Sequence, residues 1–293
     1  SVMGISLGIE ATSCIRCGHC VAVCPAHIFS QESGERGAIG LQNVSSCIVC
    51  GHCAAVCPTG AVVHSAFPAD TIHPIDRAGL PTPEQVLALC RARRSNRAFS
   101  RKPVPRESLE LILEAAHRAP TASNAQEVGF TWVTDPERLK RVIELTIDTF
   151  DGVARKLENP ILRPVLRRIM PQVYRYLPNF HRLVAAWREQ GEDLILRGAT
   201  AVLFIHTPAG ARFGQADANL AYQNGSLMAE SLGVSQFYTG FVCSAVGQDR
   251  RGRFAELLGL DKGRRIQAGM AVGMPTFRFP NYMDKQPVEA AWL

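Results

Sequence analysis

The sequence predicts an α+β protein built from two domains, and three observations carry this prediction. Eight of the ten cysteines lie in residues 14–57, in two runs offset by 33 residues from Cys14 to Cys47. Residues 67–83 hold four prolines and a glycine, a composition typical of a linker. From residue 82 onward, helical and strand-like apolar patterns alternate to the end of the 293-residue chain. We therefore expect a small domain at residues 1–66, a linker at 67–81 and a larger domain at 82–293.

Each cysteine run reads C-x2-C-x2-C-x3-C-P, ending at Pro25 in the first run and Pro58 in the second. This spacing is typical of bacterial ferredoxins with two [4Fe–4S] clusters, in which the fourth cysteine of each run binds the other cluster. We expect one cluster to be held by Cys14, Cys17, Cys20 and Cys57. The other cluster is expected on Cys47, Cys50, Cys53 and Cys24. A module this short buries little apolar core, so the metal would stabilise it.

Zinc and disulfides explain these cysteines less well. Structural zinc uses four ligands, usually in two CxxC pairs, rather than eight in this double pattern. A disulfide framework needs an oxidising compartment. The first ten residues lack the features of a secretory signal, so we expect a cytoplasmic protein. Of the two remaining cysteines, Cys90 shares a helical apolar stripe with Val86 and Leu89 and is expected in the core, whereas Cys243 has no stronger assignment.

The larger domain begins with a helix. Thr82 is a predicted N-cap, Pro83 occupies the first helical position and Gln85 completes a capping box, so the helix runs to about Arg93. A second helix, whose apolar face includes Leu109, stops at Pro120. Strands are expected at residues 128–134, 201–207, 235–242 and 266–274. Further helices are expected from residue 135, at 216–232 and near 254–258. These elements predict a mixed sheet flanked by helices.

Residues 151–193 form a predicted helical insertion. They contain eight Lys or Arg against five Asp or Glu, and four prolines divide them into short helices. Two compatible interpretations remain open. One is that the insertion packs on the domain, and the other is that it forms a lid over a ligand site.

Polar segments with basic or small residues recur in the larger domain. Residues 93–99 (RRSNRAF) carry three guanidinium groups and a hydroxyl, which suit a phosphate and a polyol chain, although arginines are also favoured at any helix C-terminus. Residues 119–126 (APTASNAQ) offer amide and hydroxyl groups to a flat heterocycle. Residues 238–241 (YTGF) contain a glycine that permits close approach of a ligand, and residues 273–278 (GMPTFR) supply another arginine.

In their order and spacing, these segments resemble the nitroreductase family of FMN flavoproteins over about residues 82–293. The whole chain resembles the ferredoxin-fused nitroreductases. The resemblance implies a three-layer α+β domain and a homodimer with FMN at its interface. By motif position, the phosphate and ribityl chain would be held by Arg93, Arg94, Ser95 and Arg97, with help from Arg278. The isoalloxazine would be lined by Pro120, Thr121, Ala122 and Asn124. Thr239 and Gly240 would lie beside flavin N5, where many relatives have Glu-Gly, so that carboxylate is absent here.

The resemblance implies an oxidoreductase in which electrons enter through two clusters and leave from flavin N5. The acceptor would be a nitro-substituted compound, a quinone or another conjugated electrophile, and no catalytic acid or base is assigned. The alternative is an electron-transfer protein that serves a protein partner. A third, weaker class is flavin chemistry on a dedicated metabolite. The donor would be a low-potential carrier such as ferredoxin, or NAD(P)H docking transiently, because no G-x-G-x-x-G fingerprint is present.

Charge and hydropathy argue against nucleic-acid and membrane roles. The formal net charge is +6, from 32 Lys and Arg against 26 Asp and Glu. Two dianionic clusters would contribute −4 and leave +2, and no basic stripe with interleaved aromatics is present. No apolar run approaches the roughly 18 residues that a membrane helix needs.

Overall fold

The computed structural model describes residues 4–293 as two units, and each is described by itself. The N-terminal unit extends to Pro81 and includes Thr121–Gln126, and the C-terminal unit comprises Thr82–Pro120 and Glu127–Leu293. Residues 1–3, with which the expected first domain begins, lie outside the described residues. The expected linker at 67–81 is grouped with the N-terminal unit and contains a short turn, η2 (Ala69–Thr71).

The N-terminal unit repeats one order of elements, strand, short helix and strand, twice along the chain. Two short helices, α1 (His19–Val23) and α2 (His52–Val56), follow the 33-residue offset of the cysteines. Two antiparallel pairs join β1 (Leu7–Ile9) to β4 (Val62–His64) and β2 (Phe29–Gln31) to β3 (Ile39–Leu41), which is followed by η1 (Val44–Ser46). Its main apolar cluster of buried residues is small and consists of Cys20, Ile28, Phe29, Cys53 and Val62. So small a core matches the expectation that a bound metal stabilises this unit.

The C-terminal unit is built on a four-stranded sheet with the order β5-β6-β8-β7. The strands are β5 (Gly129–Val133), β6 (Ala201–Pro208), β7 (Ser235–Tyr238) and β8 (Arg264–Gly273). We expected a mixed sheet, but every pairing among the described strands is antiparallel. The central strands β6 and β8 are buried on both faces, which explains their continuous apolar runs.

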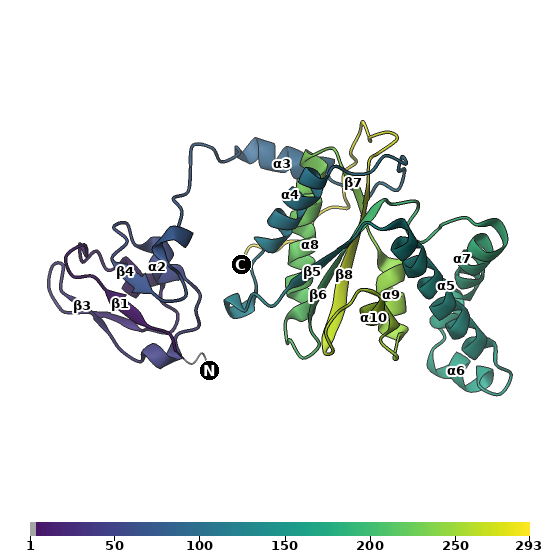
Figure 1. The fold of residues 1–293 in the computed structure, drawn as a ribbon, viewed down its shortest axis with the longest axis horizontal. Coiled ribbons are helices and arrows are strands. Elements are labelled where there is room, and N and C mark those ends of the chain that lie inside the picture. The colour runs from purple at the N-terminus through teal and green to yellow at the C-terminus, as the bar shows by residue number, and fades with distance from the viewer. Residues whose placement is uncertain (1–3) are drawn as a thin grey trace. The chain divides into compact units, whose positions relative to one another are not determined.

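Helices cover both faces of this sheet, so the expected three-layer α+β architecture is confirmed (Figure 1). Alternate residues of β6 point to opposite faces. Leu203 and Ile205 pack with α4 (Arg106–His117) and the long α8 (Gly214–Ser231). Val202 and Phe204 pack with α5 (Pro136–Glu158), α9 (Gly240–Gln248) and α10 (Arg253–Leu257).

The predicted helix starts are confirmed where a side chain caps the helix. In α3 (Pro83–Ala92), the Thr82 hydroxyl accepts from the Gln85 N–H at 3.2 Å, and the Gln85 side chain accepts from the Thr82 N–H at 2.9 Å. The Asp135 carboxylate caps α5 by accepting from the Arg138 N–H at 3.1 Å. Both helices also place a proline in the first turn, which needs no backbone donor.

Two further sequence expectations were wrong in this unit. The strand expected at 235–242 ends at Tyr238, because Gly240 begins α9 and the apolar residues after it lie on a helix. Cys90 was expected in the core but is exposed. Helix α3 contains no buried residue, and Val86 on the same stripe is also exposed. Val86 and Cys90 do share one face of α3, as predicted, but no part of the described chain covers that face.

Within residues 151–193, where a helical insertion is predicted, α5 continues without a break to Glu158. Helices α6 (Arg163–Ile169) and α7 (Leu177–Gln190) each carry a proline in the first turn, and η4 (Val173–Arg175) lies between them. Helix α7 packs on α5, with Leu183 buried and the Phe180 and Phe150 rings stacked at 5.0 Å. No helix in residues 4–293 is long and apolar enough to cross a membrane.

Candidate functional site

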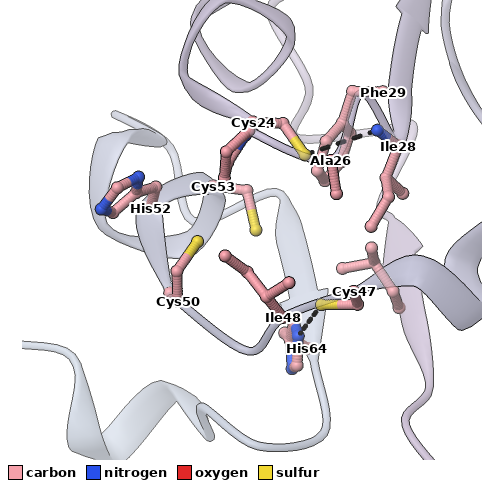
Figure 2. A pocket seen from close by; sticks show the side chains of 13 residues that line it. Cys24, Ala26, Ile28, Phe29, Cys47, Ile48, Cys50, His52, Cys53 and His64 are labelled. Atoms are coloured by element: carbon pink, nitrogen blue, oxygen red, sulfur yellow. Dashed lines mark hydrogen bonds between the residues drawn. The ribbon is translucent and has the colours of Figure 1, made fainter. Parts of the chain in front are cut away.

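The N-terminal unit gathers the eight motif cysteines around two hollows. Site A is surrounded by Cys14, Cys17, Cys20 and Cys57. Site B is surrounded by Cys24, Cys47, Cys50 and Cys53, as Figure 2 shows. Each hollow takes three cysteines from one run and the fourth from the other run. The structure thus brings together the crossed sets that the motif spacing predicts.

Left-handed backbone conformations at repeated positions wrap each run around its hollow. Gly18 and Gly51 have φ values of 76° and 77°, and Arg16 and Val49 have φ values of 56° and 57°. Each pair is separated by the same 33 residues as the cysteines. Non-glycine residues seldom adopt this conformation, and where they do it often marks a functional loop. Each hollow therefore has one non-glycine residue in this conformation, Arg16 at site A and Val49 at site B.

Backbone N–H groups point at the sulfur atoms. Ile28 donates to Cys24 Sγ at 3.4 Å, and the equivalent Ala61 donates to Cys57 Sγ at 3.2 Å. Val49 donates to Cys47 Sγ at 3.4 Å. Such donors stabilise thiolates, the form of cysteine that binds iron.

The pKa values of two thiols illustrate the competing effects in these sites. Burial alone would raise the pKa of Cys57, but N–H groups of residues 59, 61 and 62 and the Thr59 hydroxyl outweigh burial, so the pKa is lowered. Burial dominates at Cys53 and raises its pKa to about 11. Iron binding must therefore displace a proton from Cys53.

The donor set fits [4Fe–4S] clusters. Site B is lined by apolar side chains, including Ile28, Phe29 and Ile48, which exclude water from the sulfur atoms. Among the described residues, no three His, Cys, Asp or Glu side chains are arranged to hold a single metal ion. Four cysteines around an apolar hollow, with N–H groups on the sulfurs, suit a polynuclear iron–sulfur group.

The arginine-rich loop at residues 93–99 is anchored by Asn96, a buried residue that the sequence did not single out. The Asn96 side-chain amide donates to Ser235 Oγ and to the Phe277 carbonyl, both at 3.0 Å. The backbone adds bonds from Ser100 N to the Met274 carbonyl and from Thr276 N to the Ala98 carbonyl. The loop is therefore held against β7 and the segment after β8.

This anchoring brings the predicted phosphate-binding arginines to one end of the C-terminal unit. The Arg94 guanidinium lies 4.3 Å from the Phe279 ring centroid, and its Nε is buried without a hydrogen-bond partner. Arg278 Nη2 lies 3.4 Å from a Glu230 carboxylate oxygen, so part of its charge is already compensated. Arg93 and Ser95 are half-buried in the same loop. A buried, unpartnered guanidinium nitrogen is the feature expected where an anionic ligand completes the site.

A cavity of about 300 Å³ lies in the C-terminal unit beside this loop. It is lined by two predicted site residues, Arg97 and Gly240, while Thr239 is buried next to Gly240. Further lining residues are Leu194, Ile195, Arg197, Phe237, Tyr238, Phe241 and Ser244. The volume and the mixture of aromatic and basic side chains are typical of a small-molecule site.

Arg197 was missed by sequence reasoning because nothing in its local motif distinguishes it. Its backbone is left-handed, with φ at 55°. The Asp193 carboxylate holds this turn by accepting N–H groups of Ile195, Leu196 and Gly198 at 2.8–2.9 Å. The strained turn presents an exposed guanidinium at the cavity. Only the Asp193 capping pattern, read together with the fold, could have identified it.

Cys243 lies one helical turn after Thr239, close to the cavity. Burial raises the pKa of its thiol to about 11, and burial also raises the pKa of Tyr238 to about 12. Burial therefore disfavours the ionised form of both groups.

The loop at Thr121–Gln126 is grouped with the N-terminal unit, whereas Pro120 belongs to the C-terminal unit. The Asn124 side-chain amide donates to the Val49 carbonyl at 2.9 Å, within the second cysteine run. Ser123, Asn124 and Gln126 all have positive φ values of 50–53°. Pro120, Thr121, Ala122 and Asn124 remain predicted flavin contacts.

Comparison with known proteins assigns both parts of the chain. Residues 90–274 match the model of the nitroreductase family, and residues 6–58 match that of the 4Fe-4S dicluster domain. A Cr(VI) reductase of Pseudomonas sp. (strain G-1) is 26% identical over 66% of this chain and 68% of its own length. An FMN reductase [NAD(P)H] of Bacillus subtilis (strain 168) is 28% identical over 63% of this chain and 64% of its own length.

Among solved structures, a nitroreductase with bound FMN from Bacteroides fragilis NCTC 9343 shares the fold. Its TM-score is 0.53 at 20% identity, over 71% of this chain and 97% of that one. The family match extends over more than half of the chain and includes the arginine loop, the cavity and the whole sheet. The chain therefore belongs to the nitroreductase family of oxidoreductases and carries a 4Fe–4S dicluster ferredoxin domain at its N-terminal side.

Proposed function

We propose that this protein is an FMN-dependent oxidoreductase that takes electrons in through two [4Fe–4S] clusters and delivers them to a small electrophilic acceptor. The acceptor class is nitro-substituted compounds, quinones or other conjugated electrophiles. The observation that carries the proposal is the joint presence of two crossed cysteine sets and an arginine-bearing cavity in one chain. An iron–sulfur group transfers single electrons, and a bound flavin accepts them singly and donates them in pairs.

The residues of the chain have binding and positioning roles in this proposal. Arg93, Arg94, Ser95 and Arg97 would bind the phosphate and ribityl chain, with Arg278 beside them. The Gly240 N–H lies in the first turn of α9, where no intrahelical acceptor is available, so it is free to donate to the ring. Phe237 and Phe241 would exclude water from the ring. No side chain is assigned as acid or base, and protons come from solvent.

A homodimer is part of the proposal. Helix α3 exposes Val86 and Leu87, and the segment after β8 exposes Phe277, Tyr282 and Trp292. Exposed apolar residues on neighbouring elements are typical of a surface covered in an assembly. A second copy of the chain would cover them, with FMN at the interface.

An electron-transfer protein without a small substrate remains the second candidate. The cavity of about 300 Å³ favours the enzyme, because a carrier that serves a protein partner needs no cavity for a small molecule. Steady-state turnover with nitroaromatics, quinones and enones separates the two, using either reduced ferredoxin or NAD(P)H as donor. Turnover of any class above the rate with free FMN supports the enzyme. Reduction of protein partners alone supports the carrier.

Gly240→Ala is expected to weaken FMN binding about tenfold while the protein still folds. A methyl group at Gly240 meets nothing within 4 Å in the chain, so the added bulk enters the cavity that the ring would occupy. Overpacking of this kind costs about 1–3 kcal/mol. Fluorescence titration of the flavin-free protein with FMN measures the change.

Gly247→Ala is the matched control for this substitution. Gly247 lies on the same helix and also has open space around it, but it does not line the cavity. Its replacement should leave FMN affinity unchanged and stabilise α9 by about 0.5–1 kcal/mol. Equal effects of the two alanines on FMN affinity would remove Gly240 from the flavin site.

Arg197→Asn is expected to raise KM for acidic acceptors and to leave KM for neutral acceptors unchanged. Asparagine tolerates the left-handed backbone but removes the guanidinium. Since charge-assisted hydrogen bonds contribute about 1.5–3 kcal/mol, KM for a nitrobenzoate should rise about tenfold or more. KM for the neutral nitrobenzene should stay constant. Arg197→Lys, which retains the charge, should recover much of the affinity. Equal losses for both acceptors would contradict this role.

A further inference from the structure

His64 is a buried imidazole beside one cysteine of site B. It ends β4 with only 2% of its surface exposed, and its Nε2 lies 3.5 Å from Cys47 Sγ (Figure 2). The ring is held in place by strand pairing with Leu7 and by the Phe67 ring, at a centroid distance of 4.9 Å. The family and motif assignments give this residue no role.

Hydrogen bonding decides which nitrogen of His64 carries the proton. The Ala66 backbone N–H donates to Nδ1 at 3.1 Å. A backbone amide only donates, so Nδ1 must be the unprotonated, accepting nitrogen. The proton of the neutral ring is then on Nε2, the nitrogen that faces Cys47. His64 is therefore a donor to the sulfur atom, and Ala66 sets that direction.

Among the described residues, site A has no imidazole donor at the equivalent position. The 33-residue repeat places Gln31 at the position equivalent to His64, and Cys14 at the position equivalent to Cys47. The Gln31 amide donates to the Arg16 and Gly37 carbonyls, both at 3.0 Å. The Gln31 amide therefore donates to backbone carbonyls rather than to a cysteine sulfur. The two halves share their N–H donors at Cys24 and Cys57. Among side-chain contacts to sulfur in the described residues, site B has His64 at 3.5 Å from Cys47 Sγ, whereas site A has the Thr59 hydroxyl at the longer distance of 3.8 Å from Cys57 Sγ.

We propose that His64 raises the reduction potential of the cluster in site B above that of the cluster in site A. Reduction adds one electron, and hence one negative charge, to the cluster and its sulfur ligands. A hydrogen-bond donor on a ligand sulfur stabilises the more negative state, which is one of the means by which proteins set cluster potentials. An electron on a cluster in site A would then be more stable on a cluster in site B, and its transfer would make or break no bond. His64 is a positioning residue that acts through Cys47.

The inference rests on the proposed pair of clusters, so iron content is measured first. About eight iron atoms per chain, the content of two [4Fe–4S] clusters, establishes the premise. About four or fewer would count against the proposed function itself, before any potential is measured.

His64→Phe and His64→Gln are the test variants. Phenylalanine keeps the ring, and glutamine restores the residue of the other repeat. Anaerobic redox titration followed by electron paramagnetic resonance should give two midpoint potentials in the wild type. In His64→Phe, the higher potential should fall enough to change the electron's partition between clusters about tenfold, or 59 mV for a one-electron couple. In His64→Gln, whose side-chain amide can still donate to the Cys47 sulfur, the fall should be smaller. The lower potential should not move. His52→Phe is the control, because His52 lines the same hollow but is exposed.

Wild-type protein labelled with ¹⁵N-histidine supplies an independent readout. Pulsed electron paramagnetic resonance should detect ¹⁵N coupling to the higher-potential cluster, and both variants should lose it. Unchanged potentials, or an equal fall of the higher and the lower potential, would overturn the proposal. If a variant loses iron and its potentials cannot be compared, the ¹⁵N coupling in the wild-type protein tests the proposal. Coupling on the lower-potential cluster, or on neither, is the contradicting result.

Discussion

Cys57→Ala is expected to empty site A and leave site B intact, although Cys57 lies in the second cysteine run. The reason is the crossed arrangement, since Cys57 shares its hollow with Cys14, Cys17 and Cys20. Loss of one ligand of four exposes the cluster to solvent and oxidation. Iron should fall from about eight to about four atoms per chain, the content of one remaining [4Fe–4S] cluster.

Alkylation followed by mass spectrometry identifies which cluster is lost. The three partners of Cys57 should become reactive to iodoacetamide, and the cysteines of site B should stay protected. Cys90→Ala is the control, because Cys90 is exposed and lies in neither hollow, so full iron content is expected. Labelling of Cys47, Cys50 and Cys53 in the Cys57 variant would show that each run binds its own cluster.

Arg94→Ala is expected to weaken FMN binding about 10- to 100-fold. Arg94 has a buried, unpartnered Nε and a guanidinium held against Phe279, so it is positioned to bind a phosphate without a large loss of side-chain freedom. A hydrogen bond to a charged group contributes about 1.5–3 kcal/mol, which sets the size of the effect. Fluorescence titration of the flavin-free protein gives the dissociation constant.

Riboflavin, which lacks the phosphate, separates phosphate binding from general damage. Its affinity should be the same for wild type and Arg94→Ala. Arg101→Ala, at an exposed position just after the loop, should bind both flavins like the wild type. Equal weakening of FMN and riboflavin by Arg94→Ala would show that Arg94 supports the fold of the loop rather than the phosphate.

Features with a strong local cause were predictable from the sequence. The cysteine runs carry their own spacing, and the structure gathers them as that spacing predicts. Helix α3 begins where its capping box lies, and β6 follows a continuous apolar run. In each case a short stretch of chain contains the physical reason for the structure.

The features that the sequence analysis predicted wrongly or did not identify are those that depend on tertiary structure. The stripe of Cys90 is apolar, but whether such a stripe is covered depends on elements distant in sequence. Residues 240–242 read as a continuation of β7 because an apolar run does not distinguish a strand from a buried helix. His64 and Arg197 were not singled out because their roles depend on which neighbours the fold places beside them.

An anaerobic reductive titration, followed by absorbance and with iron and flavin quantified per chain, tests the central claim most directly. The account predicts about eight iron atoms and one FMN per chain. Electrons supplied to the clusters should bleach the iron–sulfur absorbance and then the flavin absorbance, and a nitroaromatic should reoxidise both. Bleaching of the clusters with a flavin that stays oxidised throughout would contradict the account.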